Sequence, residues 1–162
     1  MSASVPTRTV PDLSFLLART DHVLATRMAA AMARLGITPR GYCVLFHAAE
    51  AERTQIELAA LSDLDKTTMV VTVDQLERAG LAERRPSSTD RRARIIAVTE
   101  TGRHVVAEGT RIADQVHQDV LDALPSEQRD VLTDALTRLA QGHLAAPVES
   151  DRPVRRTRRP RG

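Results

Sequence analysis

The sequence predicts a mainly α-helical protein with one short β-hairpin, and three observations support this fold class. Apolar residues recur at helical spacing through most of residues 12–145. The period changes once, after Gly80, where two short extended segments flank a polar turn. The 162 residues include no tryptophan, one tyrosine and two phenylalanines, so the core must be built largely from aliphatic side chains.

The first predicted helix covers residues 12–35 and follows a flexible N-terminal arm at residues 1–11. Gly36 ends this helix, as glycine commonly does. One face of the helix is apolar and consists of Leu13, Leu17, Leu24, Met28, Ala31 and Leu35.

The second helix begins after Thr38, with Pro39 at its first position, and ends near Glu50. Its middle, residues 42–46, is apolar all round, which indicates a buried central helix.

Two short helices follow, and their start signals are specific. Thr54 and Glu57 have the spacing of a capping box, which opens a helix at about 55–62. Asp65 is the N-cap of the next helix, at about 66–79. Two short helices around a turn of three or four residues predict a helix-turn-helix.

The hairpin and two longer helices complete the fold. Leu81–Arg85 and Arg94–Val98 are the strands, and the turn between them begins at Pro86, so the pair forms a wing. Thr99 caps a fifth helix, and Pro125 separates it from a last helix. The apolar residues of that last helix are Val131, Leu132, Ala135, Leu136, Leu139 and Leu144.

Charge is unevenly distributed along the chain. Residues 1–150 hold 17 basic and 20 acidic side chains, whereas residues 151–162 hold six arginines and one aspartate. Residues 147–162 have no apolar period and are expected to be a disordered, arginine-rich tail. A second basic cluster lies in and beside the predicted wing, at Arg84, Arg85, Arg91, Arg92 and Arg94. Clustered guanidinium groups favour a polyanionic partner.

Several functional classes find no support in the sequence. No apolar run approaches the roughly 18–20 residues of a membrane span, and no secretory signal is visible, so we expect a soluble cytoplasmic protein without a membrane partner. A single cysteine, Cys43, and five scattered histidines offer no metal-ligand spacing. The chain has no Gly-rich phosphate loop and no nucleophile motif, so we expect neither an enzyme nor a cofactor.

The order of these elements, together with specific motifs, resembles the MarR family of bacterial winged-helix transcriptional regulators. The motifs that carry the resemblance are Thr54-Gln55 with Glu57-Leu58-Ala59, Leu64–Thr68, Val73–Leu81, Asp90–Arg94 and Val98–Gly102. The resemblance implies one domain at residues 12–146, with a DNA-binding core at about 38–99. It further implies dimerisation helices at about 12–35 and 100–145.

The resemblance also implies a partner and a mode of binding. Family members are homodimers that bind pseudo-palindromic duplex DNA, with the helix at 66–79 in the major groove and the wing in the minor groove. The residues expected to contact DNA are Thr54, Gln55, Lys66, Thr67, Thr68, Val71, Gln75, Asp90, Arg91 and Arg92. Asp90 would hold the guanidinium of Arg92 in place.

One departure from the family pattern concerns the middle of the recognition helix. Members often have a threonine and then an arginine or lysine where this chain has Val70 and Val71. An outward Val71 can contact only apolar features of a base, such as a thymine methyl.

A candidate effector site follows from the first helix. Phe15, Arg19 and His22 share the face of the first helix that lies opposite its apolar face. In the family, a pocket between the first, second and fifth helices holds phenolic acids. Arg19, His22 and Tyr42 have side chains of the types that hold a carboxylate or a hydroxyl there. Dimer packing is the alternative explanation of that face. Cys43 is expected to be inert.

The function expected from the sequence is a dimeric, sequence-specific transcriptional regulator, a repressor released by a small aromatic or phenolic ligand. The alternative is a non-specific or architectural DNA-binding protein without a ligand, which the arginine-rich tail and the wing would drive.

Overall fold

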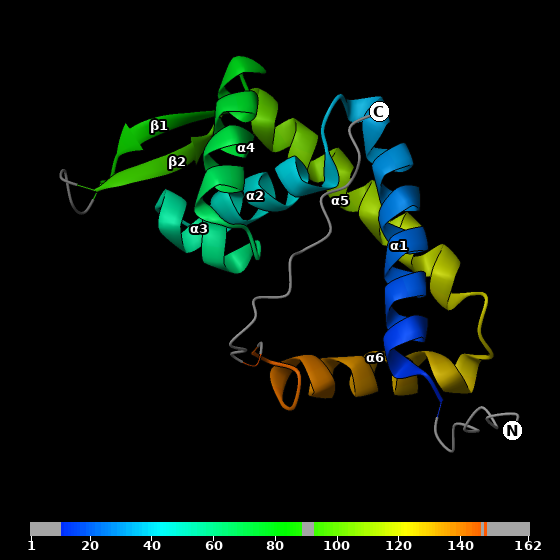
Figure 1. The fold of residues 1–162 in the computed structure, drawn as a ribbon. Coiled ribbons are helices and arrows are strands. Elements are labelled where there is room, and N and C mark those ends of the chain that lie inside the picture. The colour runs from blue at the N-terminus through cyan, green and yellow to red at the C-terminus, as the bar shows by residue number, and fades with distance from the viewer. Residues whose placement is uncertain (1–10, 89–92, 147, 149–162) are drawn as a thin grey trace, which may run out of the picture. The chain divides into compact units, whose positions relative to one another are not determined.

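The structure is a computed structural model that describes residues 11–88, 93–146 and 148, and the chain divides into two compact units, Met1–Gln118 and Asp119–Gly162. The elements in chain order are α1 (Leu13–Met32), η1 (Ala33–Leu35), α2 (Pro39–Glu50), α3 (Gln55–Leu61), α4 (Lys66–Arg78), β1 (Ala82–Pro86), β2 (Arg94–Val98), α5 (Glu100–Leu121) and α6 (Ser126–Gln141). Figure 1 shows this succession. The predicted fold class, mainly helical with a two-stranded antiparallel wing, is confirmed.

The predicted ends of the first four helices are confirmed to within a residue or two. The Thr38 hydroxyl accepts the Gly41 N–H at 3.0 Å, and Pro39 occupies the first helical position. Gly36 and Gly80 end their helices with φ of +65° and +68°, a conformation that favours glycine. One difference is that the last turn of the first helix tightens into the 3₁₀ segment η1.

The core of the first unit lies where α2 meets its neighbours. The largest fully buried side chains are Met32, Leu45, Leu58, Met69, Ile96, Val44 and Val73, from α1, α2, α3, α4 and β2. The prediction that residues 42–46 are buried all round was wrong, because Tyr42, Cys43 and Phe46 are only half-buried. The neighbouring elements cover only one side of α2.

The hairpin is joined to the loop before α3 as well as within itself. β1 and β2 pair antiparallel from Ala82 opposite Val98 to Pro86 opposite Arg94. The Ile96 N–H donates to the Arg53 carbonyl at 3.1 Å, so this loop runs alongside β2. Pro86 ends β1 instead of opening the turn, which is compatible with proline because the end of a strand does not require its N–H.

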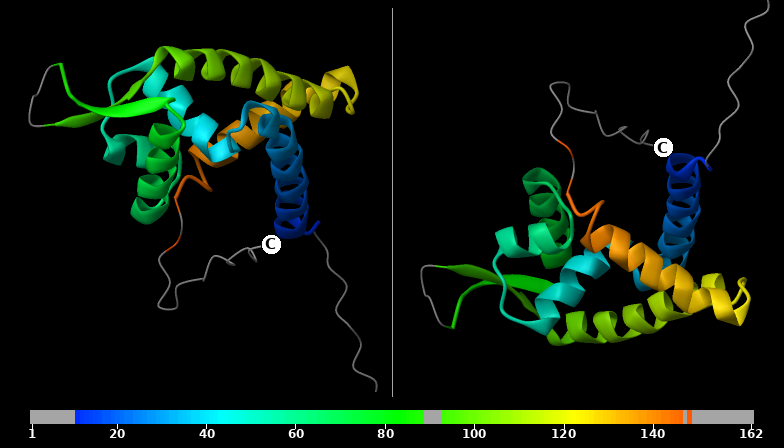
Figure 2. Two further views of the ribbon diagram at one scale, coloured as in Figure 1. Left: turned by 90° about the horizontal axis from the view of Figure 1, so that it is seen from above. Right: turned by 90° about the horizontal axis from the view of Figure 1, so that it is seen from below.

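Thr99 connects the hairpin to α5. Its hydroxyl accepts the Gly102 N–H at 3.0 Å, as predicted for an N-cap, and donates to the Gly80 carbonyl at 2.8 Å. Gly102 has no room for a side chain, because an added Cβ would lie 2.0 Å from the Leu81 carbonyl oxygen. In both views of Figure 2, α5 leaves the base of the hairpin and runs away from it.

The second unit contains α6, a helix with no buried residue. Its apolar residues remain exposed, with Val131 at 66% and Leu136 at 43%. The Arg129–Asp122 ion pair, at 2.7 Å, braces the turn that precedes the helix. The helix ends at Gln141, so the prediction that Leu144 belongs to it was wrong. The Gly142 N–H donates to the Leu139 carbonyl and closes the helix.

Candidate nucleic-acid interface

The N-terminus of α4 is fixed by an aspartate cap. Asp65 accepts the Thr68 N–H at 2.9 Å and the Thr68 hydroxyl at 2.7 Å. These bonds, the hydroxyl bond first, lower the pKa of the Asp65 carboxyl below its ordinary value. The cap leaves Lys66 and Thr67 exposed at the same end of the helix.

The two sides of α4 differ sharply in burial. The inward positions are Met69, Thr72, Val73 and Leu76. The outward side presents Thr67, Val71 and Gln75, which follow one another at intervals of four residues and form one exposed stripe. Val71 is 52% exposed. The structure therefore brings four predicted contacts, these three and Lys66, onto the outward face of one helix.

The capping box predicted for α3 is complete. The Thr54 N–H and hydroxyl donate to the Glu57 carboxylate at 2.7 and 2.8 Å, and the Glu57 N–H donates back to the Thr54 hydroxyl at 3.3 Å. These bonds lower the pKa of Glu57. The Thr54 hydroxyl donates its proton to Glu57, so it cannot also donate to a phosphate. A phosphate at this end of α3 would have to bind other groups of the helix terminus.

Arg84 of β1 joins the two helices of the motif to the wing. Its guanidinium forms ion pairs with Glu77 and, at 2.7 Å, with Asp74, both on α4. Its Nη2 donates to the Gln55 side chain of α3 at 3.5 Å, and its backbone N–H donates to Glu77 at 2.9 Å. Sequence reasoning grouped Arg84 with the phosphate-binding arginines, but the structure places it between carboxylates.

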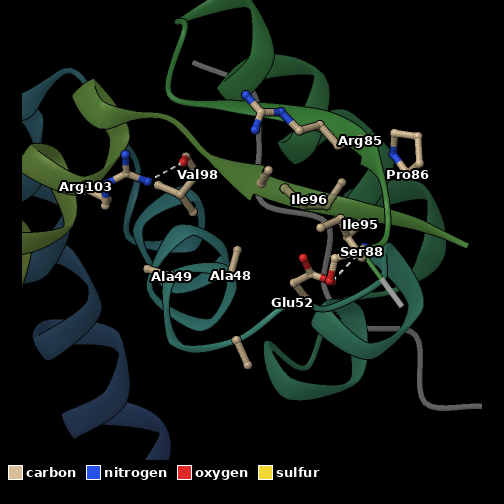
Figure 3. Close-up of a pocket in the computed structure, with 12 residues that line it drawn as sticks. Ala48, Ala49, Glu52, Arg85, Pro86, Ser88, Ile95, Ile96, Val98 and Arg103 are labelled. Carbon is tan, nitrogen blue, oxygen red and sulfur yellow. Dashed lines mark hydrogen bonds between the residues drawn. The ribbon is translucent and has the colours of Figure 1, made fainter. Parts of the chain in front are cut away.

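A second junction holds the open end of the described hairpin. Glu52, in the loop before α3, accepts the Ser88 hydroxyl at 2.9 Å and the Ser88 N–H at 3.2 Å, and Figure 3 shows these two residues side by side. Glu52 also accepts the Ser87 hydroxyl at 3.1 Å. These bonds, with the Ser88 hydroxyl first, lower the pKa of Glu52. Sequence reasoning missed Glu52, because its partners lie 35 and 36 residues further along the chain.

The remaining members of the predicted basic cluster fall into two groups. Arg85 forms an exposed ion pair with Glu83, and Arg94 is exposed at the start of β2. The predicted minor-groove contacts Asp90, Arg91 and Arg92 lie outside the described residues, as does the predicted tail apart from Val148.

The residues predicted for an effector site lie on two helices. Phe15, Arg19 and His22 are all exposed along α1, with Phe15 at 61%. Tyr42 is half-buried on α2, and its hydroxyl lies 2.9 Å from the Thr110 hydroxyl of α5. Its ring packs on Gly109, where an added Cβ would lie 2.6 Å from a ring carbon. Tyr42 is therefore anchored by α5 and by the neighbouring ring of Phe46.

A hollow of about 500 Å³ lies between the end of α2 and the hairpin (Figure 3). Small side chains such as Ala49 and Ala97 line it, and Glu52 and Arg103 stand on opposite sides of it. Both of these charged groups have partners, since Arg103 donates to the Val98 carbonyl at 2.9 Å. We assign this hollow no ligand.

Within the described part of the chain, no group of three or more histidine, cysteine or acidic residues is arranged to hold a metal ion. Among the same residues, no helix combines the length and apolar character that crossing a membrane requires.

Comparison with known proteins identifies relatives of the chain. Residues 35–93 match a sequence family described as the MarR family. A crystal structure of CouR from Rhodococcus jostii RHA1 bound to p-coumaroyl-CoA is similar at 31% identity, with a TM-score of 0.73, over 85% of this chain and 96% of that one.

Two further solved structures are similar over most of their length. A transcriptional regulator of the MarR family from Rhodococcus sp. RHA1 shares 29% identity over 83% of this chain and 96% of that chain, with a TM-score of 0.73. The transcriptional repressor CouR bound to a 23-mer DNA duplex shares 28% identity over 79% of this chain and 92% of that chain, with a TM-score of 0.72.

Proposed function

The chain belongs to the MarR family of winged-helix, DNA-binding transcriptional regulators, and from this premise we propose that it is a dimeric, sequence-specific repressor. It binds a pseudo-palindromic operator whose half-sites lie about 10 bp apart, because a two-fold dimer presents its recognition helices one helical turn apart. As a DNA-binding regulator of this family, it acts in the cytoplasm.

The observation that carries this proposal is the exposed stripe of Thr67, Val71 and Gln75 on α4. A helix fits the major groove, where each base pair has a distinct pattern of chemical groups. Arg84 holds α4, α3 and the wing in one arrangement, so the stripe is presented by a rigid unit. The relative bound to a DNA duplex supports the same assignment.

The proposed contacts with DNA divide by role. Lys66 and the N-termini of α3 and α4 bind phosphates, because free N–H groups and positive partial charge meet there. The base contacts come from the stripe, and the wing contacts come from Asp90, Arg91 and Arg92. Thr54 and Thr68 donate their hydroxyls within caps, so they act by positioning the helix ends.

We extend the proposal to an effector, an aromatic or phenolic acid or its coenzyme A thioester. The support is the relative bound to p-coumaroyl-CoA, together with Arg19, His22 and Phe15 on the exposed face of α1. Tyr42 of α2 would take part through its hydroxyl, which lies 2.9 Å from the Thr110 hydroxyl of α5. A ligand that favours the DNA-free arrangement raises the melting temperature of the free protein and weakens operator binding.

The second candidate function is non-specific DNA binding, which the six arginines within residues 151–162 favour. Competition between the promoter DNA upstream of the gene and bulk DNA, at moderate salt, separates the two. A specific regulator prefers its operator by at least about 10³-fold. A ratio near one with a steep salt dependence would establish the non-specific alternative.

The effector is tested by titrating p-coumarate and p-coumaroyl-CoA into the protein with and without operator. A higher melting temperature together with weaker operator binding supports the proposal. No response to either compound, from a protein that still selects its operator, would contradict this choice of effector.

A further inference from the structure

We infer that Val71 recognises the C5-methyl group of one thymine in each operator half-site, and that this apolar contact makes Val71 a specificity-determining residue. The inference rests on the proposed function, since it concerns how α4 reads its DNA. It assigns a chemical preference to the middle of the recognition helix, where hydrogen-bonding side chains would ordinarily be expected.

The first argument is the position of Val71. It is 52% exposed, and its neighbours one turn before and after, Thr67 and Gln75, are exposed with it. The helix is held from behind by Met69 and Val73, which are fully buried, so α4 cannot rotate Val71 inward without exposing them. A DNA base that docks against the centre of this exposed stripe therefore contacts the branched, apolar side chain of Val71.

The second argument is that three polar side chains beside Val71, but off the stripe, are already engaged. The Thr68 hydroxyl donates to Asp65 at 2.7 Å, and the Thr72 hydroxyl donates to the Thr68 carbonyl at 2.8 Å. The Asp74 carboxylate accepts from Arg84 at 2.7 Å. These side chains cannot turn toward a base beside Val71 without breaking bonds that hold the helix and the wing.

The third argument is the distribution of charge on α4. Its cations, Lys66 and Arg78, stand at its two ends, about 18 Å apart along the axis at a rise of 1.5 Å per residue. Guanine is usually read by the side-chain donors of arginine or lysine, and the middle of this helix offers neither. Of the four bases, thymine alone presents a methyl group in the major groove.

The neighbouring glutamine extends the preference. Gln75 lies one turn beyond Val71, and a glutamine amide can bond to both N6 and N7 of adenine. One helical turn is about 5.4 Å, between one and two base-pair steps. We therefore expect the selected thymine to be accompanied by an adenine within about two base pairs.

The test begins with the full-length protein and an operator selected from randomised duplex DNA. Each thymine of one half-site, and its symmetry mate, is then replaced by deoxyuridine, which removes the C5-methyl group and keeps the base pairing. At one thymine position per half-site, the replacement should lower the affinity of the wild type by about fourfold for each methyl removed. This is the loss expected when one methylene-sized group is no longer buried in the complex.

Two variants assign the effect to a residue. Val71→Ala should discriminate between the thymine and deoxyuridine operators less strongly than the wild type, because the two γ-methyl groups that reach the thymine methyl have been removed. Val70→Ala is the matched control: it removes the same atoms from the adjacent position, which is 38% exposed and lies off the stripe. It should retain the discrimination of the wild type. Circular dichroism verifies that both variants fold.

The outcomes separate this inference from the proposed function. If the wild type selects an operator but no deoxyuridine replacement changes its affinity, or if Val71→Ala discriminates as strongly as the wild type, the inference is overturned and the regulatory function stands. If the wild type binds operator and random DNA alike, the proposed function itself is wrong, and the inference fails with it.

Discussion

Arg84 and Arg85 are adjacent in sequence and carry the same charge, yet their surroundings differ. Arg84 is half-buried and bonds to two carboxylates on α4, whereas Arg85 is 61% exposed and pairs with Glu83 on its own strand. A half-buried, multiply bonded charge contributes more to stability than an exposed pair, which solvent screens. The two residues therefore form a natural comparison.

Arg84→Ala should lower the free energy of unfolding by about 1–3 kcal/mol, because it leaves two carboxylates unpaired beside each other. Arg85→Ala should change it by less than about 1 kcal/mol. Urea denaturation of both variants measures the difference. Equal losses would show that Arg84 does not join the wing to α4.

Glu52 makes the junction at the open end of the hairpin dependent on pH. Its carboxylate accepts three bonds from Ser87 and Ser88, and its pKa lies below the ordinary value of 4.5. A lowered pKa in the folded state contributes stability above the unfolded value, and that contribution is lost as the pH falls through the folded value.

Glu52→Gln should therefore melt at a lower temperature than the wild type above about pH 5, with the difference shrinking as the pH falls below 4.5. Glutamine keeps an acceptor but lacks the charge, so it mimics the protonated glutamate. Thermal melts between pH 3 and pH 7 measure both curves. A difference independent of pH would mean that the charge of Glu52 does not stabilise the junction.

At the scale of elements, the start of α5 is fitted tightly against the loop that leads from α4 to β1. Gly102 has no space for a methyl group, since its Cβ position lies 2.0 Å from the Leu81 carbonyl oxygen and 2.7 Å from a Val98 methyl. Because the closest atom belongs to the backbone, relief requires a movement of the chain rather than of a side chain.

Gly102→Ala should destabilise the protein by about 2 kcal/mol or more, in spite of alanine's higher helix propensity. Thr101→Ala, at the exposed neighbouring position, serves as the control and should change stability by less than about 0.5 kcal/mol. Calorimetry of the two variants provides the measurement. A stable Gly102→Ala variant would contradict the close packing at this junction.

The helices were predictable because their signals are local. Thr38, the Thr54–Glu57 pair and Asp65 each cap the helix that the sequence assigned to them, and each acts on an N–H group three residues away. Pro86 and Leu144 were misplaced because the end of a strand or helix depends on the register of the partner strand and on competing backbone bonds. Such effects leave little trace in composition.

The candidate site was predictable only in part. The helical period of α4 places Thr67, Val71 and Gln75 outward, as the structure does. The roles of Arg84 and Glu52 were not predictable, because their partners lie on other elements and only the folded chain brings them together. The assignment of Arg92 stays a prediction.

At the scale of the whole molecule, apolar residues without cover favour a second copy of the chain. On α1, Leu13 is 63% and Leu16 is 49% exposed, and on α6 Leu132 and Leu136 are 38% and 43% exposed. The expected assembly is a homodimer in which these helices pack against the partner.

A double substitution, Leu132→Glu with Leu136→Glu, should produce monomers at micromolar concentration, because it would bury charge in the interface. Thr137→Glu with Gln141→Glu adds the same charge at the same spacing near the opposite face of α6, and this variant should remain dimeric. Light scattering decides between them. A monomeric wild type would refute the dimer outright.

Deletion of residues 152–162 removes six arginines. If these residues bind phosphates without reading bases, affinity for operator and for random DNA should fall by similar factors. The slope of log affinity against log salt should flatten by about 0.9 for each phosphate that is no longer neutralised. Titrations at several salt concentrations measure this. Selective loss of operator binding would instead make the tail a base-reading arm.

The engagement of Asp74 and Glu77 by Arg84 also has a kinetic consequence. These two carboxylates and one guanidinium leave a net charge of −1 beside the centre of α4, which cannot attract DNA over long range, so we expect encounter to depend on basic residues elsewhere, including residues 151–162. We expect the short-range contacts of the α4 stripe to act only after docking and to govern how long a bound complex lasts. On this proposal, the rate of association with DNA and the lifetime of the complex depend on different parts of the chain, and a substitution can change one without the other.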